Sequence, residues 1–421
     1  MKEKNNITQV AKILALTEDA FGIYDMRKTI LIAYYSMMLG GSTTSLLALL
    51  NNLSPEEYEI DLQLQNNTGP FLNQVPTYVN LLPPANIYTG IKGKLLKGLN
   101  YVFSGTAIKA WWINRKHGKR GTNGQIWEDF SARHFSRENP KEYDIAIGFL
   151  EGWPVRYIAY NIHAKKKLGW LHSTFSKLAP VPELEKPWME RVNQIVFVAE
   201  DCRNAFATEM PEFAEKAITI PNIIDSTLLR ERAEQTEETD EDFVQFRDAD
   251  CFKLVTVCRI NISVKGLDRT VACAKQLKKQ GRKFLWMIVG DGKDMTALHD
   301  LIAQANVADC VIPVGSRMNP LPFIAAADLF CMLSRYEGKP MVVTESMILG
   351  TPPLVTHYLS AEEQIQNGIE GLIVENAENT ALEAILKCMD QPEMVQSMKE
   401  YLLRHEYGNK KDIHTITQRY F

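Results

Sequence analysis

The sequence lacks paired cysteines, long apolar runs and a large excess of charge of either sign. Its seven cysteines are scattered over 421 residues, and none forms a CxxC pair. A disulfide framework or a zinc site is therefore not expected, and a reducing compartment fits. No run reaches the roughly 18 apolar residues of a transmembrane helix. The short N-terminal apolar stretch ends at Glu18 and Asp19 without a cleavage site. We expect a cytoplasmic protein, with room for peripheral contact at the inner face of the cell membrane.

The net charge of -4 is close to neutral for this length, so total charge identifies no partner. The order of apolar patterns is more informative. A strand-like run, ILIAYY, precedes a glycine turn and a helical stretch, and this alternation continues through EIDLQL, YDIAIGF, KLGWLHS and QIVFVAE. A second alternation begins at FKLVTVC and runs to PPLVT. Two such series predict an α/β protein with two Rossmann-like, doubly wound domains.

The composition between these series suggests where the domains divide. Residues 231–250 are acidic and poor in large apolar side chains, which is typical of a linker. The predicted parts are an N-terminal arm (1–28), a first domain (29–228), an acidic linker (229–251), a second domain (252–395) and a C-terminal helical segment (396–421) that crosses back to the first domain.

Two glutamates flank a predicted helix start in SRYEGKPMVVTESMILG. Glu337 lies in the loop after the LFCMLS strand, and Glu345 lies about one and a half turns into the helix. Pro340 suits the first helical turn because its missing N–H has no partner there. The free N–H groups at this helix start favour binding of a diphosphate. The two carboxylates can accept hydrogen bonds from the hydroxyl groups of a sugar and a ribose.

Other candidates follow neighbouring strands. Arg259 and Lys265 lie six residues apart after LVTVC, where two cations can neutralise a departing nucleoside diphosphate. Gly290 opens a tight turn after the next strand, which lets the backbone approach a ligand. Ser316 and Arg317 follow VIPVG, where the backbone suits a nucleobase, although an ordinary loop fits equally.

These segments resemble the retaining glycosyltransferases of family 4, which have the two-domain GT-B fold with a cleft between the domains. The resemblance covers about residues 252–375 and touches the first half at GlyGly 40–41, FLEG, LGWLHST and IPNIID. Ile223 stands where the family usually has glycine, which weakens any statement about that turn. The resemblance implies sugar transfer from a nucleoside-diphosphate sugar to the hydroxyl of a glycan or lipid-linked glycan acceptor, in cell-surface polysaccharide or glycolipid biosynthesis.

The resemblance also implies roles for individual residues. Arg259 and Lys265 would stabilise the leaving diphosphate, Glu337 and His172 would face the donor sugar, and Glu345 would hold the ribose. The remaining expected donor contacts are Gly40, Gly41, Gly290, Ser316, Arg317, Gly338, Lys339, Pro340, Met341 and Val342. Taken alone, His172 would more often be a structural histidine.

No metal or other cofactor is expected. Asp240-Glu241-Asp242 and Asp248-Ala249-Asp250 match the D-x-D metal pattern of a different transferase fold. Both lie in the acidic stretch rather than at the end of an apolar strand, so we interpret them as solvated charge.

Residues 91–121 are rich in lysine, arginine, leucine and aromatic residues and contain no aspartate or glutamate. This mixture suits the surface of an anionic membrane. An ordinary helix pair with a solvated basic side fits as well, and nothing else in the chain supports nucleic acid as a partner. Two other functions remain open: a catalytically silent GT-B subunit that binds another transferase, and a GT-B nucleotide-sugar epimerase.

Overall fold

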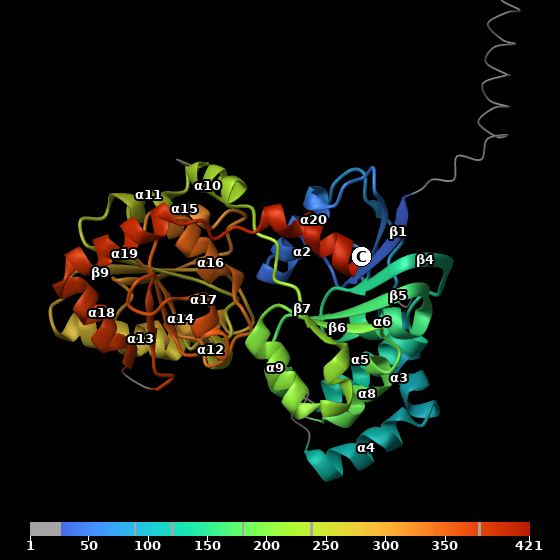
Figure 1. The fold of residues 1–421 in the computed structure, drawn as a ribbon. Helices are drawn as coiled ribbons and strands as arrows, with labels where there is room; N and C mark the ends of the chain where they lie inside the picture. Colours follow the sequence, from blue (N-terminus) through green and yellow to red (C-terminus); the bar gives the residue numbers. More distant parts are fainter. Residues whose placement is uncertain (1–26, 88–89, 119–121, 179–180, 236–238, 378–379) are drawn as a thin grey trace, which may run out of the picture.

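The computed structural model describes residues 27–87, 90–118, 122–178, 181–235, 239–377 and 380–421. Most of the predicted N-terminal arm, and a small part of the predicted basic stretch and linker, lie outside these ranges. Two α/β domains stand side by side, each with a central sheet and helices on both faces (Figure 1). The predicted fold class is confirmed.

A parallel seven-stranded sheet forms the first domain within the described ranges. Its strand order is β3-β2-β1-β4-β5-β6-β7. The strands are β1 (Lys28–Tyr34), β2 (Tyr58–Leu64), β3 (Asn80–Leu81), β4 (Asn139–Gly148), β5 (Ile162–Leu171), β6 (Gln194–Phe197) and β7 (Ala217–Thr219). The main helices are α2 (Gly41–Asn52), α3 (Gly90–Phe103), α4 (Thr106–His117), α5 (Thr122–His134), α6 (Trp153–Asn161), α7 (Phe175–Leu178), α8 (Lys186–Met189) and α9 (Glu200–Glu209).

The second sheet is also parallel and, in the part of the chain that the structure describes, has six strands in the order β10-β9-β8-β11-β12-β13. They are β8 (Phe252–Val257), β9 (Phe284–Val289), β10 (Val311–Gly315), β11 (Leu329–Met332), β12 (Pro353–Thr356) and β13 (Leu372–Val374). Its helices are α10 (Ser226–Glu234), α11 (Glu241–Asp248), α12 (Ile262–Lys265), α13 (Leu267–Lys279), α14 (Met295–Ala305), α15 (Leu321–Ala325), α16 (Met341–Ile348), α17 (Ala361–Gln364), α18 (Thr380–Asp390) and α19 (Pro392–Arg404). The final helix, α20 (Ile413–Tyr420), leaves this domain.

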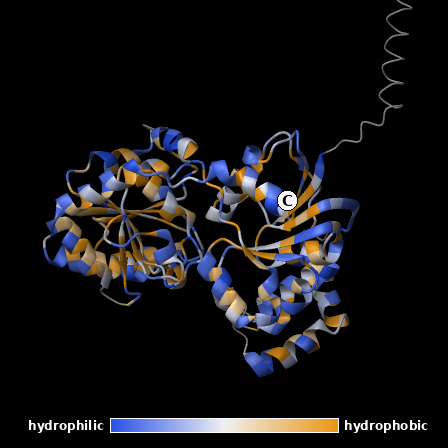
Figure 2. Cartoon of the chain, in the orientation of Figure 1, coloured by the Kyte–Doolittle hydropathy of each residue, from blue (hydrophilic) through white to orange (hydrophobic). Residues whose placement is uncertain are grey.

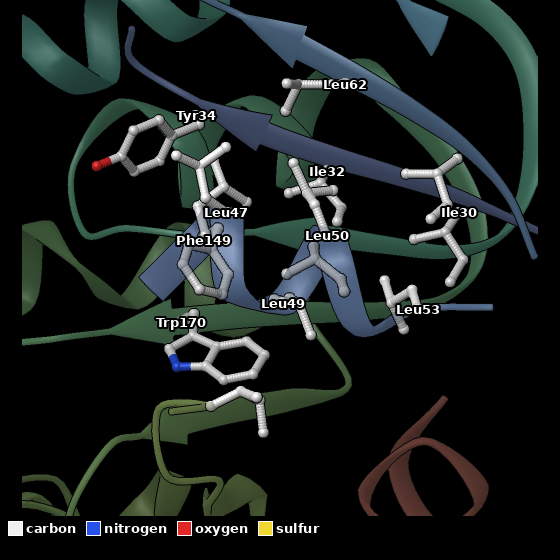
Figure 3. Close-up of a cluster of buried hydrophobic side chains, with 14 of the residues drawn as sticks. Ile30, Ile32, Tyr34, Leu47, Leu49, Leu50, Leu53, Leu62, Phe149 and Trp170 are labelled. Carbon is white, nitrogen blue, oxygen red and sulfur yellow. The ribbon is translucent and has the colours of Figure 1, made fainter. Parts of the chain in front are cut away.

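Strand β1 explains why the apolar runs in the sequence are continuous. Side chains of a strand alternate between the two faces of the sheet. Ile30 and Ile32 pack under α2 on one face (Figure 3), whereas Leu31 and Ala33 belong to the core on the other face. A strand covered by helices on both faces has a nearly continuous apolar sequence, as β1 does from Ile30 to Ala33. Figure 2 shows the same arrangement in both domains, with hydrophobic strands inside and hydrophilic residues on the outer helices.

The predicted linker differs from the observed structure. Residues 229–251 contain most of α10 and all of α11, and Phe243 and Phe246 are buried in the core of the second domain. Although the segment is rich in acidic residues, its two phenylalanines have the spacing of one buried face of a helix. The chain instead passes between the domains just before α10, which begins after its N-cap Asp225.

A second crossing returns the chain to the first domain. After α19 the chain reaches α20, whose Ile416 packs with Phe421 in the core of the first domain. The two crossings are hydrogen-bonded to each other, because Asn409 donates its backbone N–H to the Ile224 carbonyl at 3.0 Å and its side chain to the Asn222 carbonyl at 2.9 Å. The domains are therefore held by two adjacent segments. Among the described residues, no helix is long and apolar enough to cross a membrane.

Candidate functional site

A cavity of about 560 Å³ lies between the two domains. Its walls come from the carboxyl ends of strands in both sheets, the edge at which doubly wound folds bind ligands. Each residue expected at the site from the sequence lines it: Gly40, Gly41, His172, Arg259, Lys265, Gly290, Ser316, Arg317, Glu337, Gly338, Lys339, Pro340, Met341, Val342 and Glu345.

A cation and a carboxylate meet at the wall formed by the second domain. Lys265, at the end of α12, lies with its Nζ 2.6 Å from Oε1 of Glu337, in the loop after β11. The two side chains are only 22% and 12% exposed. A partly buried pair is screened less by salt than a surface pair. The two segments singled out from the sequence are thus joined directly.

Two helices begin at the cavity, one from each domain. Helix α2 starts after Gly40, and α16 starts after Pro340, so both present free backbone N–H groups to the same space. A Cβ atom on Gly40 would lie 3.7 Å from the guanidinium of Arg259, which places that cation beside the start of α2. Two helix N-termini and two cations make this cavity suitable for a diphosphate.

Glu345 lies inside α16 and is buried. Burial raises the pKa of its carboxyl to about 7, because the charged form loses hydration. Arg232 of α10 opposes this shift. In this buried environment, a hydrogen bond between the Glu345 carboxyl group and a ligand hydroxyl is stronger than the same bond in water.

His172 follows β5 in the first domain, where its ring packs against Phe149 and Trp170. Burial lowers the pKa of His172 to about 3, so the imidazole is neutral near pH 7. Its buried Nε2 has no hydrogen-bond partner within the described residues. Its backbone N–H donates to Glu151 at 2.9 Å, which fixes the turn after β5. A neutral histidine here can exchange a hydrogen bond with a ligand but cannot supply a positive charge.

The domains touch at the edge of the cavity. Thr174 donates its hydroxyl to the Glu337 carbonyl at 3.1 Å. A Cβ atom on Gly338 would lie 2.3 Å from the His172 carbonyl oxygen, so only glycine permits this approach. The role of Thr174 was not predicted, although Thr174 is the last residue of the LGWLHST segment in which the resemblance lies.

The acidic D-x-D residues differ from their predicted state. Asp240 and Asp242 form ion pairs with Arg317, and Asp240 also caps α11 by accepting from the Phe243 N–H. Because the Asp240 side chain is only 14% exposed, the prediction of solvated charge is wrong for this residue. Arg317 lines the cavity with its guanidinium already paired, so its remaining contribution to a ligand comes mainly from the backbone.

Lys339 is similarly engaged, with its Nζ 2.8 Å from Glu363. Two lining residues that the sequence analysis did not select are Asn261 and Arg232. Asn261 lies between Arg259 and Lys265, in a loop selected only for its two cations, and Arg232 lies in the segment predicted to be an acidic linker. No group of three or more histidine, cysteine, aspartate or glutamate side chains suited to a metal ion occurs among the residues with described positions.

Comparison with known proteins finds a family match in the second half of the chain. Residues 237–404 match the family model of glycosyl transferases group 1. The second domain is therefore similar to group 1 glycosyltransferases. The chain is 28% identical over 149 residues to the amylovoran biosynthesis glycosyltransferase AmsK of Erwinia amylovora, covering 34% of this chain and 36% of that protein. It is 28% identical over 152 residues to N-acetyl-alpha-D-glucosaminyl L-malate synthase of Bacillus anthracis, covering 36% and 39%. These matches span less than half the length of either relative.

Solved structures extend the likeness from the second domain to both domains. Anabaena Alr3699/HepE in complex with UDP and glucose aligns with a TM-score of 0.66 and 15% identity, covering 93% of this chain and 99% of that one. Sucrose-phosphate synthase from Thermosynechococcus elongatus aligns with a TM-score of 0.66 and 17% identity, covering 93% and 98%. At these identities the likeness establishes the fold, which is GT-B.

Proposed function

We propose that the protein transfers a sugar from a nucleoside-diphosphate sugar to an acceptor hydroxyl, with retention at the anomeric carbon. The observation that carries this proposal is the convergence of Arg259, Lys265 and two helix N-termini on one cavity between the domains. That arrangement favours two adjacent phosphates. Retention rests on the resemblance of the Arg259–Lys265 and Glu337–Glu345 segments to family 4.

Each side chain has a defined part in the proposed reaction. Arg259 and Lys265 stabilise the charge that develops on the leaving diphosphate, an electrostatic contribution made in a water-poor site. Glu345 accepts a hydrogen bond from a ribose hydroxyl. Glu337 accepts a hydrogen bond from a hydroxyl of the donor sugar while it remains paired with Lys265. Neutral His172 faces the sugar through its Nε2. A phosphate oxygen of the leaving group accepts the proton of the acceptor hydroxyl.

Domain contact has a chemical purpose in this proposal. Thr174 and Gly338 bring the loop after β5 against the loop after β11. Closure around a donor excludes water, which limits hydrolysis of the activated sugar.

We propose further that transfer needs no metal ion. Arg259, Lys265 and the helix N-termini provide the positive potential that a divalent cation would otherwise supply. Activity should therefore persist in excess EDTA. Loss of activity in EDTA that returns with added Mg²⁺ or Mn²⁺ would contradict this part.

A contact with an anionic membrane completes the proposal and suits a lipid-linked acceptor. We define the α3–α4 surface as the outer side of α3 and α4, which lie on the part of the first domain remote from the second (Figure 1). Its large apolar side chains are unusually exposed: Leu95, Leu96, Leu99, Val102, Phe103, Ile108, Trp111 and Trp112. Residues 90–118 contain no acidic residue. Apolar side chains among basic residues favour an anionic interface, and the seven free cysteines fit the cytoplasmic side.

A donor screen tests the central proposal. A donor that binds only the folded protein raises its melting temperature. UDP-, GDP- and ADP-sugars are screened in this way, and the active donor is then followed by anomeric analysis of the product. Lys265→Ala should abolish the shift, whereas Lys275→Ala, an exposed lysine on α13, should retain it. Equal shifts in both variants would reject the assigned site, and release of an epimerised sugar without acceptor would indicate an epimerase.

A further inference from the structure

The first domain contains a second cavity, of about 210 Å³, next to the cavity between the domains. Both cavities share the lining residues Glu151 and Leu178. The second cavity is formed by Tyr35, Gly124, Gln125, Glu128, Glu151, Gly152, Arg156, Leu171, Phe175, Leu178, Glu185 and Trp188. We call it the Glu128 cavity. Several of these residues follow β1, β4 and β5, so the cavity opens at the carboxyl edge of the first sheet, where ligands bind in this type of fold.

The Glu128 cavity has more acidic than basic side chains in its lining. The described lining carries three glutamates and one arginine. Arg156 is 1% exposed, and Glu185 accepts from it, from Trp188 Nε1 at 2.6 Å and from Gln125 at 2.8 Å. Glu185 is therefore fully engaged by the protein. Glu151 accepts from the His172 N–H and from the Ser173 hydroxyl, both at 2.9 Å, and Glu128 interacts with the Tyr35 hydroxyl. Both carboxyl groups still exceed the single guanidinium in number, and their oxygens have lone pairs for a further donor.

Two details indicate that the cavity has hydrogen-bonding capacity for a ligand. The Nε of Arg156 is buried and has no partner within the described residues, which is costly unless something occupies the adjacent space. Gly152 has a φ of +89°, and a Cβ atom there would lie 2.2 Å from the Tyr35 hydroxyl and 3.4 Å from the Glu128 carboxyl carbon. Glycine thus keeps Glu128 and Tyr35 close together at the cavity wall. Burial raises the pKa of Glu128, which shows that water does not solvate this carboxyl freely.

The size and chemistry of the cavity select its ligand. It is smaller than the roughly 300–1,000 Å³ of sites for drug-sized molecules, so one ring fits better than an oligosaccharide. Carboxyl groups accept hydrogen bonds from adjacent hydroxyls, and the Arg156 N–H can donate to an oxygen. An anionic ligand would meet an excess of carboxylates and would be disfavoured.

We propose that the Glu128 cavity binds the uncharged terminal sugar ring of the acceptor, with Glu128 and Glu151 accepting ring hydroxyls and Arg156 Nε donating to a ring oxygen. This inference rests on the proposed function. Glu151 belongs to both cavities, so a ring held here reaches the donor side from the first domain. The acceptor hydroxyl then approaches the donor sugar near His172, whose backbone Glu151 also positions.

Saturation-transfer NMR on the full chain tests this site directly. The probes are methyl glycosides of glucose, galactose and mannose, with methyl glucuronide as the charged counterpart. At least one neutral glycoside should give a signal, and methyl glucuronide should give none. Glu128→Ala should weaken the neutral signal at least tenfold, whereas Glu138→Ala, an exposed glutamate of the same domain, should leave it unchanged.

A second variant guards against a purely structural role of Glu128. Glu128→Gln keeps the size and one acceptor oxygen but removes the charge, so it should fold and should bind methyl glucuronide better than the wild type does. The proposal is overturned if no neutral glycoside binds, if Glu128→Ala binds as well as wild type, or if Glu128→Gln still discriminates fully against the glucuronide.

Failure of this inference is distinguishable from failure of the proposed function. The melting-temperature shift with the nucleotide sugar found in the donor screen reports on the cavity between the domains and depends on Lys265. Such a shift without glycoside binding rejects only the Glu128 cavity as an acceptor site. Glycoside binding without any nucleotide-dependent shift rejects the donor proposal.

Discussion

The Nζ of Lys265, the last residue of α12, and Oε1 of Glu337, in the loop after β11, lie 2.6 Å apart. The contact joins the turn after β8 to the turn after β11, and these strands are neighbours in the sheet. Removing one partner leaves the other charge partly buried and unpaired, which costs more than the pair contributes. The contact therefore holds both side chains in place before a donor arrives, and this preorganisation is what electrostatic catalysis requires.

Glu337→Gln should reduce kcat on the order of 100-fold, because it releases Lys265 and weakens the acceptor for a sugar hydroxyl. The rate is measured with saturating donor, once the donor screen has identified one. Glu362→Gln is the matched control, since this carboxylate lies in the same domain with a side chain 80% exposed. A Glu337→Gln enzyme with wild-type kcat would show that the ion pair has no part in turnover.

Gly338→Ala should impair the contact between the domains without unfolding either. The added methyl group would meet the His172 carbonyl oxygen at 2.3 Å, a distance at which the loops must separate. We expect a loss of activity on the order of tenfold or more, since small misplacements at a reaction centre are expensive, together with a nearly unchanged melting temperature. Gly98→Ala provides the comparison, because a Cβ atom there meets nothing within 4 Å. Equal activity of both variants would contradict the importance of this contact.

Glu345→Gln should change how stability depends on pH. The pKa of Glu345 is about 7 in the folded protein, above the ordinary 4.5. Its favourable contribution is therefore fully present below about pH 4.5 and is lost as the pH rises through about 7. Between pH 5 and pH 8 the free energy of unfolding of the wild type should fall relative to that of Glu345→Gln, by on the order of 2 kcal/mol. Urea denaturation at both pH values measures this difference, and a constant difference would contradict a neutral, buried Glu345.

The sequence predicted those parts of the molecule in which local pattern and position determine the outcome. Strand β1 is apolar at each of its core positions because both faces are covered, and the turn after it places Gly40 at the sheet edge. The site residues follow strands, and parallel strands end at one edge, so Arg259 and Glu337 had to lie near each other.

Local sequence patterns do not predict contacts between segments that are far apart in the chain. The hydrogen bond of Thr174 with Glu337 spans 163 positions, and no local spacing specifies such a pair. The prediction of a linker over residues 229–251 was wrong for another reason. The segment has the acidic composition of a linker, but Phe243 and Phe246 lie three residues apart on one side of a helix and pack in the core. The ion pair of Asp240 with Arg317 depends on how α11 docks beside the turn after β10, which no local sequence pattern specifies.

Binding to membranes should depend on both components of the α3–α4 surface. Vesicles containing phosphatidylglycerol should sediment the protein, and vesicles of phosphatidylcholine alone should sediment far less. Phe103→Ser with Trp112→Ser removes side chains that are 84% and 62% exposed, so it should weaken binding strongly at little cost in stability. Neutralising exposed Lys109, Arg115 and Lys116 should weaken it by about 1 kcal/mol for each residue near the lipid surface, and added salt should reduce that effect. Lys97 is left intact because it donates to Asn86 at 2.8 Å. A control pair on α13, Lys275→Gln with Lys279→Gln, removes exposed charge from the second domain. If the control pair lowers membrane binding as much as the α3–α4 variants do, then binding depends on the total charge of the protein, and the α3–α4 surface is not the membrane-binding face.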